Sequence, residues 1–214
     1  MSVMNEVKEI NGLKIIGITG EAGSGKTTIT KLYAKHHKEA YVILTDDVAR
    51  ELMNVGEPCY EKVVEHFGKN ILKEDMSIDR PKLASIVFND ENELKILNSI
   101  VHGEVVSKVR YIINNINCLN NENNCGNIYS VILLESAILF QVEDLVKLCD
   151  EIWYVEARET DRRERLKRER GYSEERIEAM SISQECIRRM KDRCDKVIIN
   201  DRDIKELDNS LFSV

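Results

Sequence analysis

The stretch GITGEAGSGKTT, residues 17–28, decides the fold that we predict for this chain. It follows the apolar run LKII and carries Gly20, Gly25, Lys26 and Thr27 in the spacing of a phosphate loop. In such a loop, backbone N–H groups surround an anion, and the lysine reaches the outer phosphates of a nucleotide. The alternative is a glycine turn that ends by chance in Lys-Thr. It is disfavoured because a strand pattern precedes the loop and a helix pattern follows it.

The loop supplies the first candidate site residues. We assign nucleotide phosphate binding to Gly20, Glu21, Ala22, Gly23, Ser24, Gly25, Lys26, Thr27 and Thr28. Lys26 is also a catalytic candidate, because its charge bridges the β- and γ-phosphates of ATP. Thr28 has a simpler alternative role in packing or in capping the following helix.

Length, composition and charge exclude several classes of protein. The 214 residues with 43% hydrophobic content suit one globular domain over residues 1–214. A formal charge of -7 argues against a broadly basic nucleic-acid binder. The chain has no signal-like start, no apolar run of membrane-spanning length and no CxxC pair among its six cysteines. We therefore expect a soluble cytoplasmic protein with reduced thiols and no membrane partner; the sequence does not specify an oligomeric state.

Short apolar runs alternate with helical patterns along the chain. Because the runs are almost continuously apolar, they predict strands that are covered on both faces. The predicted strands are residues 13–19, 41–45, 129–135, 151–156 and 196–200. This order predicts an α/β fold in which a parallel five-stranded sheet is flanked by helices.

The long segment between the second and third predicted strands predicts an insertion. It is far longer than a crossover requires and is mostly helical in pattern, so we expect an inserted helical subdomain over residues 48–115. Residues 114–127 include eight asparagines, and this composition predicts a mobile surface loop.

Two carboxylates follow predicted strands, where ligands bind in open α/β sheets. Glu135 ends the run VILLE, and with the Thr27 hydroxyl it predicts a Mg²⁺ site; alternatively, it is only the first polar residue after a core strand. Asp46, in ILTDDVAREL, is a candidate base for an acceptor hydroxyl. The competing interpretation is that Thr45 or Asp46 caps the helix that follows.

A charged segment predicts a lid over residues 158–184. Residues 158–170 contain seven basic and four acidic side chains, a surplus of +3. Three possible i,i+4 pairs (Glu159–Arg163, Asp161–Arg165 and Glu164–Arg168) would also suit a plain surface helix. The arginine surplus favours a lid, because fork-shaped donors can close over a triphosphate and exclude water.

With these residues in view, the chain resembles the dephospho-coenzyme A kinase family from Lys14 to about Asn200. The specific marks, in order, are DDVAREL, FGKNIL, DMSIDRPKLASIVF, LNSIVHGEV, VILLESAILF, RLKRERGYS, Gln184 and CDKVIIN. The resemblance implies a phosphate-loop kinase fold with a helical acceptor-binding subdomain and a lid. It also implies the final step of coenzyme A synthesis, in which ATP with Mg²⁺ phosphorylates the ribose 3'-hydroxyl of dephospho-coenzyme A.

The resemblance also implies roles for individual residues. Asp46 aligns with the family's catalytic base, and Arg170 aligns with a lid arginine that we take as catalytic. The other matched positions are Arg50, Arg80 and His102 for the acceptor and Arg165 for the nucleotide.

Three departures from the family pattern bear on the acceptor. Leu44 replaces an aspartate, Gly103 replaces a proline, and Gln141 replaces a glutamate. The alternatives are therefore a kinase for another nucleotide or small metabolite, a regulatory ATPase, or a nucleotide-binding module without activity.

Overall fold

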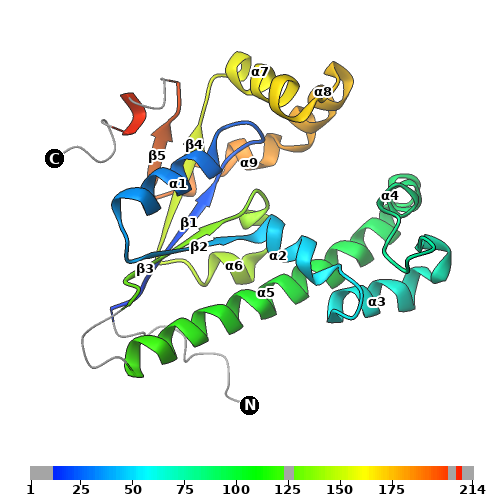
Figure 1. Ribbon diagram of the computed structural model, residues 1–214. Helices are drawn as coiled ribbons and strands as arrows, with labels where there is room; N and C mark the ends of the chain where they lie inside the picture. Colours follow the sequence, from blue (N-terminus) through cyan, green and yellow to red (C-terminus); the bar gives the residue numbers. More distant parts are fainter. Residues whose placement is uncertain (1–11, 123–127, 202–205, 209–214) are drawn as a thin grey trace. The chain divides into compact units, whose positions relative to one another are not determined.

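The computed structural model describes residues 12–122, 128–201 and 206–208 (Figure 1). The chain divides into two compact units. One unit combines Met1–Ile43 with Ile116–Val214, and the other is Leu44–Asn115.

The first unit is built on a five-stranded sheet with the order β2-β3-β1-β4-β5. Its strands are β1 (Lys14–Thr19), β2 (Ala40–Leu44), β3 (Val131–Glu135), β4 (Glu151–Glu156) and β5 (Lys196–Ile199). The central strand β1 runs parallel to both neighbours, with Ile18 opposite Glu135 on β3 and opposite Trp153 on β4. The predicted parallel α/β sheet is thereby confirmed, with each strand ending within a residue of the expected position.

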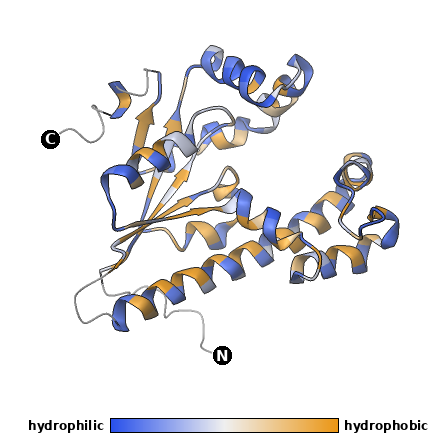
Figure 2. Cartoon of the chain, viewed as in Figure 1, coloured by the Kyte–Doolittle hydropathy of each residue, from blue (hydrophilic) through white to orange (hydrophobic). Residues whose placement is uncertain are grey.

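One face of this sheet is covered by α1 (Lys26–His36) (Figure 1). Ile29 and Leu32 of α1 are buried in a cluster with Ile16, Leu133 and Val155 from three strands. Figure 2 shows the strands as mainly hydrophobic, as expected for strands that are covered on both faces. Burial of each such aliphatic side chain contributes about 1.5–3 kcal/mol to folding, so this cluster fixes α1, and the loop before it, on the sheet.

Short helices complete the first unit. They are η2 (Leu139–Gln141), α6 (Glu143–Val146), α7 (Glu159–Arg170), α8 (Glu174–Ser183), α9 (Glu185–Arg189) and η3 (Lys191–Arg193). Helix α7 is almost entirely hydrophilic (Figure 2). Its Leu166 nevertheless packs with Ile177 of α8 and Ala22 of the phosphate loop in a small buried cluster. This apolar contact places the charged helix beside the loop.

The second unit is helical. It contains α2 (Thr45–Leu52), α3 (Pro58–Phe67), η1 (Lys69–Ile71), α4 (Arg80–Asn89) and the first part of α5 (Glu91–Glu122). The Asp79 side chain caps α4 by accepting a hydrogen bond from the Lys82 N–H at 3.3 Å. Helices α3 and α5 are joined by a hydrogen bond between His66 Nε2 and Glu93 Oε2, at 2.7 Å.

The prediction of a surface loop at residues 114–127 is wrong for residues 114–122, which are the last turns of α5. The apolar stripe of Val109, Ile113 and Ile116 continues through this segment and is buried. Asn120, 7% exposed, takes the next place on that stripe. Its side chain accepts hydrogen bonds from the Ile128 and Tyr129 N–H groups at 3.0 and 3.1 Å. This asparagine is therefore buried and hydrogen-bonded, which the composition of the segment did not indicate. Residues 123–127 lie outside the described residues.

In the described part of the chain, no helix has both the length and the apolar character needed to span a membrane. The five cysteines that can be described there are free thiols.

Candidate functional site

The phosphate loop connects β1 to α1, and its backbone requires glycine at two positions. Gly20 has a φ of 145°, and a Cβ there would lie 2.3 Å from the Val155 carbonyl oxygen. Gly25, the residue before α1, has a φ of 92°, and a Cβ there would lie 2.0 Å from Asn200 Nδ2. Both glycines therefore permit a close approach between the loop and neighbouring backbone or side chains.

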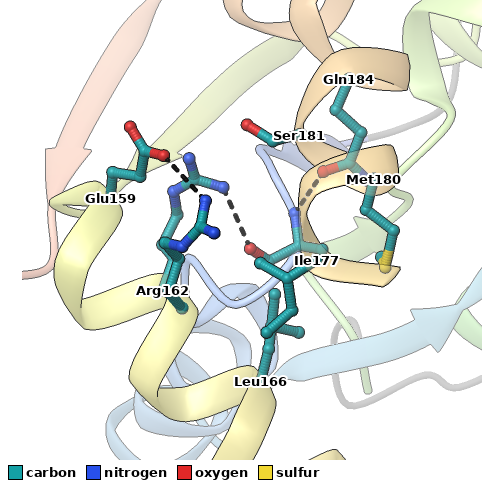
Figure 3. Close-up of a pocket in the computed structure, with 9 residues that line it drawn as sticks. Glu159, Arg162, Leu166, Ile177, Met180, Ser181 and Gln184 are labelled. Atoms are coloured by element: carbon teal, nitrogen blue, oxygen red, sulfur yellow. Dashed lines mark hydrogen bonds and ion pairs between the residues drawn. The ribbon is translucent and has the colours of Figure 1, made fainter. Parts of the chain in front are cut away.

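Three consecutive carbonyl groups of the loop accept hydrogen bonds from side chains elsewhere in the same unit. The Ala22 oxygen accepts from Arg162 Nη1 at 3.4 Å, and the Gly23 oxygen accepts from Arg165 Nη1 at 3.2 Å. The Ser24 oxygen accepts from Asn200 Nδ2 at 2.7 Å and from Arg165 Nη1 at 3.3 Å. Figure 3 shows the Arg162 contact.

These contacts orient the peptide planes of the loop. In a planar trans peptide, the C=O and the N–H point in opposite directions. Because the Ala22 and Ser24 carbonyls point toward arginine and asparagine donors, the N–H groups of Gly23 and Gly25 point away from those donors. The Gly23 and Gly25 N–H groups, just before the N-terminus of α1, are therefore candidate donors to an anion.

Lys26 supplies positive charge at this loop. Its Nζ donates hydrogen bonds to the Gly20 oxygen at 2.9 Å and to the Glu21 oxygen at 3.1 Å. The ammonium is therefore held beside the loop backbone, where it can interact with the phosphates of a nucleotide.

The structure brings Thr27 and Glu135 together, as the sequence predicted. Thr27 Oγ1 donates to Glu135 Oε1 at 2.7 Å, and Thr30 Oγ1 lies 3.1 Å from Glu135 Oε2. A hydroxyl and a carboxylate are oxygen ligands that suit Mg²⁺, so these residues fit the expected ion. In the described residues no group of three or more His, Cys, Asp or Glu side chains is arranged so that it could hold a metal ion.

Sequence reasoning missed an ion-pair network centred on Glu21. Glu21 Oε1 lies 3.1 Å from Arg162 Nη2 on α7 and 2.8 Å from Arg188 Nη2 on α9. The neighbouring Ala22 N–H donates to Gln184 Oε1 at 2.8 Å (Figure 3). A small pocket lies between this part of the loop and helices α7 and α8. Gln184 and Asn200 belonged to the motifs that we recognised, and Arg162 was one of the basic residues of the charged segment but had no predicted role of its own. No local pattern indicated Arg188.

The charged helix combines surface pairs with loop contacts. Two of the three possible pairs form, with Glu159–Arg163 at 3.3 Å and Glu164–Arg168 at 3.2 Å. In place of the third, Asp161 pairs with Arg158 at 3.0 Å, and Arg165 hydrogen-bonds to the phosphate loop. Arg170 is the exposed last residue of α7, and its catalytic role stays a prediction.

The predicted base and acceptor-binding residues all belong to the second unit. Asp46 is exposed in the first turn of α2, whereas the Asp47 carboxylate accepts a hydrogen bond from Arg50 at 2.8 Å. Helix α2 begins at Thr45, and the buried Thr45 hydroxyl has no hydrogen-bond partner among the described residues, so the interpretation of Thr45 as the helix cap is wrong. Arg80 begins α4.

His102 lies on α5 in the second unit and is half-buried. Burial lowers the pKa of His102 from its ordinary value near 6.5. This shift favours the neutral form of the imidazole. The acceptor-binding role of this residue also stays a prediction.

The parallel sheet and the loop define a phosphate-loop fold. Solved structures with this fold include a Thermus thermophilus protein (TM-score 0.72, 24% identity, 94% of this chain and 95% of that chain). They also include a dephospho-CoA kinase from Campylobacter jejuni (TM-score 0.55, 21% identity, 93% and 94%).

Sequence comparison identifies the family. The dephospho-CoA kinase family model matches residues 14–206. A dephospho-CoA kinase of Carboxydothermus hydrogenoformans is 33% identical over 202 residues, covering 94% of this chain and 93% of the relative. One of Oceanobacillus iheyensis is 35% identical over 201 residues, covering 92% and 96%. The chain belongs to the dephospho-CoA kinase family.

The position of Lys26 yields a direct prediction. Lys26→Ala should reduce kcat for phosphoryl transfer by about 100-fold or more, because it removes a fixed positive charge that stabilises the transferring phosphoryl group. Lys31→Ala is the matched control, since Lys31 is exposed on the same helix. Steady-state assays on folded variants check this, and near-normal turnover of Lys26→Ala would contradict the assignment of the loop.

Proposed function

We propose that the protein transfers the γ-phosphate of ATP to the ribose 3'-hydroxyl of dephospho-coenzyme A, the final step of coenzyme A biosynthesis. The observation that carries this proposal is the family match over residues 14–206. The phosphate loop, with Lys26 against it and with Thr27 beside Glu135, supports the use of ATP as the donor. A cytoplasmic location stays a prediction from the sequence.

The loop residues would bind and orient the nucleotide. The N–H groups of Gly23 and Gly25 would donate to phosphate oxygens, and Lys26 would stabilise the charge that develops on the transferring phosphoryl group. Thr27 and Glu135 would hold Mg²⁺, Glu135 through the ion's water shell. When bound, the ion supplies positive charge that neutralises phosphate oxygens.

Asp46 is the residue that we propose as the base. Its carboxylate is exposed and does not cap α2, whereas that of Asp47 is engaged by Arg50. An aspartate near the acceptor hydroxyl can take its proton as the oxygen attacks phosphorus. We propose that Arg50, Arg80 and His102 bind the acceptor in the second unit.

We also propose that residues 158–184 act as a lid. The guanidinium of Arg165 hydrogen-bonds to the Gly23 and Ser24 oxygens, so it would have to leave these carbonyl groups to bind a nucleotide phosphate. Arg170 lies more than one turn further along α7 and is exposed, so it is available to donate to the transferring phosphate when a nucleotide is bound.

The two aspartates at the start of α2 give the second prediction. Asp46→Asn should lower kcat by about 100-fold, the usual contribution of a positioned base, while leaving the affinity for ATP nearly unchanged. Asp47→Asn is the matched control, because it makes the same chemical change one residue along the chain. Equal and small losses in the two variants would rule out Asp46 as the base.

The acceptor gives the third prediction. Adenosine has the same ribose but lacks the pantetheine arm and the pyrophosphate. If contacts to these remote groups contribute about 3 kcal/mol to the transition state, kcat/KM should be lower for adenosine by roughly two orders of magnitude. Arg80→Ala should narrow this gap, because it would weaken the full substrate more than adenosine.

The assay follows phosphate transfer from ATP to dephospho-coenzyme A, adenosine and a panel of nucleoside monophosphates. NMR of the product determines which oxygen is phosphorylated. Preference for a monophosphate, or phosphorylation of an oxygen other than the ribose 3'-oxygen, would refute dephospho-coenzyme A as the substrate and favour a kinase for another metabolite.

A further inference from the structure

The carboxylate of Glu21 joins two helices to the phosphate loop. Its Oε1 atom accepts a hydrogen bond from Arg188 Nη2 on α9 at 2.8 Å and forms an ion pair with Arg162 Nη2 on α7 at 3.1 Å. The side chains of Glu21 and Arg162 are only 9% and 7% exposed, whereas Arg188 is 48% exposed. Charged side chains are rarely buried to this extent unless they are paired, so the Glu21–Arg162 contact is a constraint on the position of α7.

The same two helices carry or adjoin the side chains that orient the loop. Arg162 lies one turn before Arg165 on α7, and Arg165 donates to the Gly23 and Ser24 oxygens. Gln184, the residue immediately before α9, accepts the Ala22 N–H at 2.8 Å. Glu21, a side chain of the loop, thus holds α7 and α9 in place. Other side chains on or next to these helices in turn orient the peptide planes of the loop.

We infer that Glu21 is a positioning residue for ATP binding. By holding Arg162 and Arg188, it keeps α7 and α9 against the loop, and it thereby keeps the Gly23 and Gly25 N–H groups directed toward the phosphates. This inference rests on the proposed binding of ATP at the loop, but not on the identity of the acceptor.

An electrostatic role and a positioning role of this carboxylate predict opposite changes in ATP affinity when it is removed. A negative charge beside an anion site repels phosphate, so by charge alone its removal should tighten ATP binding. If Glu21 acts by position, its removal leaves the buried Arg162 guanidinium without a counter-ion and releases α7 from the loop. ATP binding should then weaken, so the sign of the change distinguishes the two accounts.

The experiment compares Glu21→Gln with Glu164→Gln. Glu164 lies on α7 in an exposed pair with Arg168, so its substitution removes the same charge from the same region but breaks no loop contact. We expect Glu21→Gln to weaken equilibrium binding of ATP by about tenfold, in line with the loss of charge-assisted hydrogen bonds. Glu164→Gln should stay within about twofold of the parent affinity, because exposed pairs contribute little.

Binding of ATP is measured by calorimetry without acceptor, and steady-state kinetics then give KM for each substrate. The KM for ATP should rise in Glu21→Gln while the KM for dephospho-coenzyme A stays unchanged. Unchanged or tighter ATP binding would overturn the inference, as would equal rises in both KM values, which indicate general loss of structure. Because calorimetry needs no acceptor, a wrong substrate assignment would leave this test intact.

A second matched pair covers the case in which Glu21→Gln does not fold. Arg188→Gln breaks the partly exposed arm of the network, and Arg189→Gln removes the same charge from the next residue of α9, which pairs with Glu185 at 2.6 Å. Arg188→Gln should bind ATP about fivefold more weakly than Arg189→Gln, because only Arg188 contacts the loop carboxylate. Equal affinities of these two variants would also overturn the inference.

Discussion

The site depends on the hydrogen bonds that Arg162, Arg165 and Asn200 donate to three consecutive carbonyl groups of the phosphate loop. A flexible glycine loop has many conformations, and most of them do not direct its N–H groups to one point. Donors on one side fix the carbonyl direction, and peptide planarity then fixes the N–H direction. These side chains can therefore orient the loop without touching an anion.

The sheet explains how these distant residues meet. Because β1 is the central strand, the strands beside it end next to the loop that follows β1. Glu135 is opposite Ile18 in the register of β3, which places its carboxylate beside Thr27. Asn200 directly follows β5, and its backbone N–H is bonded to the Glu156 oxygen of β4 at 2.7 Å. Because the strands are parallel, the Glu135 carboxylate, the Asn200 amide and the phosphate loop all lie at the same edge of the sheet.

Much of this arrangement was predictable from local patterns. Apolar runs identified the strands. The loop spacing, together with the strand end at Glu135, indicated that the phosphate loop and this carboxylate would lie close together. The Glu21–Arg188 contact could not be found in this way, because it joins residues 167 positions apart and has no periodic signal. The asparagine-rich end of α5 misled for the opposite reason: composition suggested a loop, but the apolar stripe and the buried bonds of Asn120 keep it helical. Arg165 likewise makes no ion pair with Asp161, its possible i,i+4 partner, because its tertiary contacts with the loop are favoured over a weak surface pair.

The most direct test of this account is an NMR titration of ¹⁵N-labelled protein with ATP and Mg²⁺ in the absence of acceptor. If the loop N–H groups face the phosphates, the amide protons of Gly23 and Gly25 should move strongly downfield as they form charge-assisted hydrogen bonds. Amides of the second unit, such as that of Phe88 on α4, should move little without an acceptor. Unperturbed Gly23 and Gly25 signals at saturating ATP would contradict the orientation of the loop on which the proposed chemistry depends.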